Sequence, residues 1–106
     1  MPATDTPVLD VLSAMTAASV EATSLDDEQL VLVRIAALVA SDAPPISYAL
    51  NLSAAGELDV DAEKIRGVFT AIAPIVGTAS IATALGNVAR ALAIHELAEL
   101  DDGAAV

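Results

Sequence analysis

The 106-residue sequence is long enough for one domain, and its composition excludes several classes of function. Fifteen acidic residues and only four lysines and arginines give a net charge of −11, which argues against binding to nucleic acids or to an anionic membrane. The chain has no cysteine, which excludes disulfides, thiolate catalysis and sulfur-ligated metals.

The hydrophobic residues make up 56% of the chain, whereas aromatic residues make up only 2%. Because small aliphatic side chains favour closely packed helices, we predict an all-α fold. Charged residues are only 18% of the chain, too few to cover a small monomer, so we also predict a homo-oligomer. The N-terminus has neither a basic stretch nor a long apolar one, which predicts a cytoplasmic protein without a secretory signal.

Residues 1–22 predict an N-terminal helix or arm that starts at Thr6 and Pro7. Its thin apolar stripe could dock on a neighbouring copy. The main helical domain, residues 23–100, begins with a capping-box-like pattern from Ser24 to Asp27. The helix that follows, 30–40, is apolar on all sides except at Arg34, so we expect it to be buried all round.

Arg34 is always charged and must meet a carboxylate, backbone carbonyls or water. Two interpretations remain open for this residue. It forms a structural ion pair at a helix or subunit junction, or it clamps the carboxylate of a substrate.

The segment from Pro44 to Gly56 predicts a short helix that starts at a proline pair and closes at the glycine. Ser47, Tyr48 and Asn51 group on one side of it, within very apolar sequence. Buried polar groups need hydrogen-bond partners, so this patch is either a satisfied structural network or the lining of a ligand site.

The acidic turn at 57–61 lacks the pattern of a calcium loop, and Asp59 or Asp61 is better interpreted as a helix N-cap. Residues 67–89 carry no charge and match a membrane span in length. Because Pro74 and Gly77 interrupt this run, we predict two soluble helices with a break between them and no membrane span.

His95 ends the apolar stripe of the last helix, before an acidic tail at 101–106. It is interpreted as an interface or helix-end histidine, with a catalytic role as the alternative. It has no second histidine and no cysteine beside it, so we predict no metal site and no cofactor.

The chain resembles the carboxymuconolactone decarboxylase family, which includes the AhpD alkylhydroperoxidases, in three stretches: LDDEQLVLVRIAALVA, YALNLSAAG and EKIRGVFTAIAPIVGTASIATAL. The resemblance covers roughly residues 25–92. It implies an AhpD-like bundle of about five main helices, assembled as a homo-oligomer such as a trimer or a hexamer.

The redox branch of that family carries Cys-x-x-Cys-x-x-x-His, which would fall on Pro44, Ser47 and Asn51 here, and a glutamate that would fall near Leu32. All four positions hold other residues. The resemblance therefore implies a family member without the thiol peroxidase machinery. The carboxylate nearest to position 32 is that of Glu28, one turn earlier.

The predicted pocket consists of Ser47, Tyr48, Asn51 and Glu28. The resemblance implies either a small-molecule binder or a thiol-independent enzyme of lyase or decarboxylase type. The decarboxylase branch normally uses the histidine that Asn51 replaces, so catalysis stays open. The alternative class is a non-catalytic, homo-oligomeric structural or interaction protein. A cavity beside Asn51 would favour the first class, and a pocket filled by side chains would favour the second.

Overall fold

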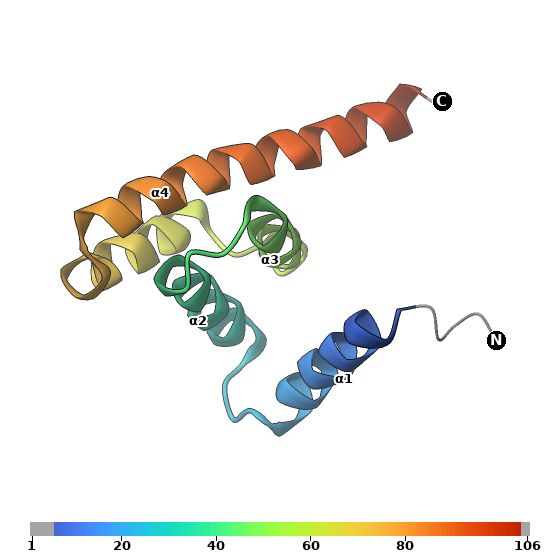
Figure 1. Ribbon diagram of the computed structural model, residues 1–106, viewed down its shortest axis with the longest axis horizontal. Helices are drawn as coiled ribbons and strands as arrows, with labels where there is room; N and C mark the ends of the chain where they lie inside the picture. The colour runs from blue at the N-terminus through green and yellow to red at the C-terminus, as the bar shows by residue number, and fades with distance from the viewer. Residues whose placement is uncertain (1–5, 105–106) are drawn as a thin grey trace.

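A computed structural model describes residues 6–104, and the side chains of residues 6–93, as helices joined by short turns (Figure 1). The helices are α1 (Pro7–Ala22), α2 (Asp27–Ala40), α3 (Pro45–Glu57) and α4 (Ala62–Ala104). The predicted all-α class is confirmed for these residues. The core forms where α2, α3 and α4 pack together, whereas α1 buries none of its residues.

The N-terminus of α2 is held by a capping box, although not by the pair that the sequence pattern predicts. The Asp26 carboxylate accepts the backbone N–H of Gln29 at 2.8 Å, and the Gln29 side chain accepts the backbone N–H of Asp26 at 3.1 Å. The predicted box from Ser24 to Asp27 is therefore displaced by two residues. Two backbone donors of the first turn gain partners, which stabilises the helix by about 1 kcal/mol.

The prediction that residues 30–40 are buried all round is wrong for this chain. Val31, Ile35 and Val39, spaced by one helical turn, are buried against α3 and α4. Val33 on another side of α2 is 54% exposed. Both helices of the core lie against one face of α2, so Val33 on another side remains exposed.

Aspartates, rather than the predicted Gly56, take the left-handed conformation after α2 and α3. Asp42 has φ 55° and Asp59 has φ 57°. In each turn the next residue donates its N–H to a carbonyl of the preceding helix, at 3.0 Å from Ala43 and 2.9 Å from Val60. This Schellman arrangement tolerates aspartate because its short side chain permits positive φ.

The start of α4 and its interruption both follow the sequence pattern. The Asp61 carboxylate accepts the backbone N–H of Glu63 at 3.0 Å, which confirms Asp61 as the N-cap. At Gly77 the backbone leaves the helical region, with φ 86° and ψ 164°, and the chain turns back on itself (Figure 1). The predicted break is confirmed.

By length and composition alone, residues Ala62–Ala93 of α4 could cross a membrane. Their most apolar stretch has a mean hydropathy of 1.8, and 11% of it is buried. The bend at Gly77 divides this stretch into two parts, 62–76 and 78–93, which at 1.5 Å per residue extend about 22 and about 24 Å, each less than the ~30 Å of a bilayer core. The apolar length is therefore weak evidence for a membrane span.

Candidate functional site

The predicted polar patch on α3 is divided between two faces of the helix. Ser47 and Asn51 are half-buried and lie one turn apart, and the Asn51 side-chain amide donates to the Ser47 carbonyl at 2.9 Å. Tyr48 is fully buried in the core. Because successive residues of a helix point about 100° apart, Tyr48 lies on the inward face of α3, whereas Ser47 and Asn51 lie together to one side of it.

The Tyr48 hydroxyl is a buried polar group with no hydrogen-bond partner among the described residues. Burial raises the pKa of this phenol above 10.0, and the nearby negative charge of Asp42 raises the pKa further. Both effects favour the neutral form. Its ring contributes volume to the core. Tyr48 is not among the residues that line the cavity described below.

Glu28 is engaged elsewhere. Its carboxylate accepts a hydrogen bond from the Lys64 ammonium and forms an ion pair with it, joining the start of α2 to the start of α4. That hydrogen bond, and then the charge of Glu28, raise the pKa of Lys64. The structure therefore does not place Glu28 beside Ser47 and Asn51 as the predicted pocket requires, but gives it a partner on another helix.

A cavity of about 570 Å³, open to solvent, lies between α1, α2 and α3. It brings together Arg34 of α2 and Asn51 of α3, two of the residues singled out in the sequence. The rest of its lining is mostly apolar: Met15, Thr16, Ser19, Ala37, Leu38, Leu50 and Ala54. A volume in this range suits a small organic molecule.

Arg34 is half-buried at the wall of this cavity. In the part of the chain that the structure describes, ion pairs join Lys64 to Glu28 and Arg66 to Glu63, and neither includes Arg34. The first interpretation of Arg34, a structural ion pair, is therefore not met within the described chain. Within the described residues its guanidinium makes no side-chain hydrogen bond, so its donors can bind water, a second subunit or a ligand.

Two hydroxyl-bearing residues of α1, Thr16 and Ser19, line the cavity, and the sequence pattern did not single them out. Thr16 and Ser19 lie three residues apart, so they share a face of α1 with Met15, and all three line the cavity. Two hydroxyls within an otherwise apolar helix stripe are the signal that could have revealed them. Only the packing of the helices shows that this stripe faces Arg34.

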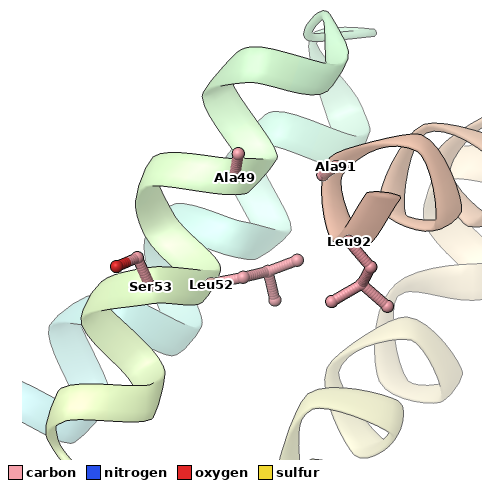
Figure 2. A pocket seen from close by; sticks show the side chains of 5 residues that line it. All are labelled: Ala49, Leu52, Ser53, Ala91 and Leu92. Carbon is pink, nitrogen blue, oxygen red and sulfur yellow. The ribbon is translucent and has the colours of Figure 1, made fainter. Parts of the chain in front are cut away.

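A second, much smaller pocket lies between α3 and the returning part of α4 (Figure 2). Its volume is about 60 Å³, and Leu52 and Leu92 point toward one another across it, while the Ser53 hydroxyl points away. It can hold at most a few water molecules, and its walls offer them little hydrogen bonding. This pocket is therefore a packing gap between two helices rather than a ligand site.

The remaining predictions about the site concern His95 and metal ions. The side chain of His95 lies outside the described residues, so neither interpretation of it is tested. Among the side chains that the structure describes, no group of three or more histidines and carboxylates lies close enough to hold a metal ion.

Comparisons with protein-family models, curated proteins and solved structures find no match for this chain.

Proposed function

We propose that this protein binds a small organic carboxylate in the cavity between α1, α2 and α3, as a member of the carboxymuconolactone decarboxylase-like group that lacks thiol peroxidase machinery. The observation that carries the proposal is that Arg34 and Asn51, from different helices, line one cavity of about 570 Å³. An enzyme of the lyase or decarboxylase type is the catalytic form of the same proposal.

The chemistry of Arg34 favours a carboxylate over other ligands. A guanidinium presents parallel N–H donors that match the two oxygens of a carboxylate. The chain has a net charge of −11, which repels anions in general, so an anionic ligand needs a local cation to hold it. Arg34 supplies that cation at the only position in the described lining that carries a charge.

The other lining residues suit the body of such a ligand. The Asn51 amide and the hydroxyls of Thr16 and Ser19 supply polar contacts, while Leu38 and Leu50 supply apolar ones. None of these groups titrates near neutral pH. The described lining therefore supports ligand binding, and it offers no side chain for proton transfer.

The test uses benzoate and its neutral analogue benzamide as probes in isothermal titration calorimetry. We expect saturable binding of benzoate and at least tenfold weaker binding of benzamide, since only the acid engages the charge of Arg34. Arg34→Gln should weaken benzoate binding at least tenfold. Arg66→Gln is the matched control, because Arg66 is exposed and paired with Glu63. No binding of benzoate, or equal binding by Arg34→Gln, would overturn the proposal.

A second candidate function is that of a non-catalytic, homo-oligomeric structural or interaction protein. Its support comes from large apolar side chains that remain exposed, including Leu50 at 68% and Ile75 at 86%. In that case Arg34 lies at a subunit junction and benzoate does not bind. Arg34→Gln would then change the mass of the assembly measured by light scattering, whereas the ligand-binding proposal predicts an unchanged mass.

A further inference from the structure

The N-terminal half of α1 carries an apolar face that nothing in the described chain covers. Pro7, Val8, Val11 and Leu12 line an open hollow of about 330 Å³, to which no other described residue contributes. Val8 is 69% exposed and Leu12 is 51% exposed. We call these four residues the α1 apolar face.

The face continues along the helix into the wall of the larger cavity. Positions 8, 12, 15 and 19 succeed one another at intervals of three and four residues, so they lie on one side of α1. Met15 and Ser19 turn this side toward α2 and α3, whereas Val8 and Leu12 lie beyond the cavity lining. Figure 1 shows α1 at the edge of the molecule, with its N-terminal end directed away from α2.

The chain exposes more surface than a compact monomer of its mass would. A compact monomer of 10.6 kDa exposes about 5,500 Å², whereas this chain exposes 7140 Å², an excess of roughly 1,600 Å². The radius of gyration is 15.3 Å, against about 13 Å for a compact domain of this length. A standard interface needs only about 800 Å² from each partner, so an open shape of this kind leaves room for a second copy.

The charges of α1 favour a second copy over a membrane surface. The helix contains Asp10 and Glu21 and no lysine or arginine. Both carboxylates lie on the side of the helix opposite Val8, so two copies could pack face to face without bringing them together. An amphipathic helix that binds anionic lipid carries basic residues on its polar face instead.

We propose that the α1 apolar face is a self-association surface, on which α1 of one copy packs against α1 of a second copy across a twofold axis. A self-complementary apolar face suits this symmetry, the commonest in soluble oligomers. The proposal does not rest on the ligand proposed above. It has a consequence for that site, because a paired α1 holds Met15, Thr16 and Ser19 in place as one wall of the cavity.

The first experiment measures mass by light scattering for the full chain and two variants. We expect the wild-type protein to have at least twice the monomer mass of 10.6 kDa. Leu12→Asp should reduce that mass by half or more, because an unpaired charge in an apolar contact is costly. Ala17→Asp is the matched control, since it adds the same charge on the opposite side of α1. A monomeric wild type would overturn the proposal, and so would a monomer that sediments with phosphatidylcholine vesicles. Equal masses for the two variants would overturn it as well.

A second experiment keeps the proposal testable if Leu12→Asp fails to fold. The chain has no cysteine, so a single introduced thiol reports on its own position. Leu12→Cys should form a covalent dimer on mild oxidation, because the twofold axis brings the two thiols together. Ala17→Cys should stay largely monomeric on a non-reducing gel. Similar dimer yields for both variants would place the contact elsewhere.

Discussion

The side-chain amide of Asn87 donates a hydrogen bond to the backbone carbonyl of Ala43 at 3.2 Å, across 44 residues of sequence. Asn87 is 8% exposed, on the part of α4 that follows the bend. Its side-chain oxygen accepts from Arg90 at 3.5 Å. One buried amide therefore ties the returning part of α4 to the turn between α2 and α3.

We expect Asn87→Ala to lower the free energy of unfolding by about 1–3 kcal/mol, because it leaves the buried carbonyl of Ala43 without this donor. The measurement is urea denaturation followed by circular dichroism at one fixed protein concentration. Thr83→Ala, at an exposed position of α4, is the control and should change stability by less than about 0.5 kcal/mol. Equal effects of the two substitutions would show that the Asn87 hydrogen bond contributes nothing.

Tyr48 should titrate at unusually high pH in the folded protein. Burial and the charge of Asp42 raise its pKa above 10.0, while the unfolded chain keeps the ordinary value. The unfolded state therefore loses this proton first, and stability falls as the pH rises through 10. The chain has one tyrosine and no tryptophan, so phenolate absorbance at 295 nm reports on Tyr48 alone. An ordinary pKa in the folded protein would contradict its burial.

Tyr48→Phe is the control for that titration. It removes the hydroxyl that has no partner among the described residues, so we expect stability at pH 7 to be unchanged or up to about 1 kcal/mol higher. It should also remove the Tyr48 contribution to the loss of stability above pH 10. A large loss of stability at pH 7 would mean that the hydroxyl has a hydrogen-bond partner, such as a buried water.

Substituting alanine at two glycines of α4 should have opposite effects. An added Cβ would meet no atom within 4 Å at Gly77 or at Gly86, so space does not distinguish them. Gly77 has φ 86°, which strains an alanine, and we expect Gly77→Ala to lower the free energy of unfolding by at least about 1 kcal/mol. Gly86 lies inside the helix, and Gly86→Ala should raise it by about 0.5–1 kcal/mol. Thermal unfolding of both variants tests this, and two stabilised proteins would argue against the bend.

Restoring the family motif tests the resemblance itself. The variant carries Pro44→Cys, Ser47→Cys, Asn51→His and Leu32→Glu. In the structure the backbone N–H of Ser47 donates to the Pro44 carbonyl at 3.0 Å, and Asn51 lies one turn further along α3. We therefore expect the histidine to lower the pKa of a cysteine thiol below its usual 8.5 or so. Thiol titration and peroxide consumption are the measurements.

The control for this variant carries only the two cysteines, with Leu32 and Asn51 unchanged. Its thiols should show the ordinary pKa and no peroxide consumption. If the complete variant folds and its thiols are no more reactive than those of the control, the four positions do not converge. The alignment of α3 with the family motif would then be incorrect.

The amino-acid sequence by itself determined the helices and most of their ends. The all-α class, the start of α1 at Pro7, the N-cap at Asp61 and the break near Gly77 all follow from the pattern of residues. These features depend on contacts within a few residues of the chain: a proline without an N–H, a carboxylate that accepts the N–H two residues later, a glycine free to take positive φ. Even the errors at Ser24 and Gly56 are small displacements within the correct turns.

Only the tertiary structure decided which side chains meet. It turns Tyr48 into the core and away from Asn51, pairs Glu28 with Lys64, and brings Arg34 and Asn51 to one cavity with residues of α1. It also leaves one side of α2 uncovered, which no periodicity predicts because the helix is apolar on nearly every side. These outcomes depend on how α2, α3 and α4 pack against one another, and that packing brings together residues far apart in the chain, beyond the reach of local pattern.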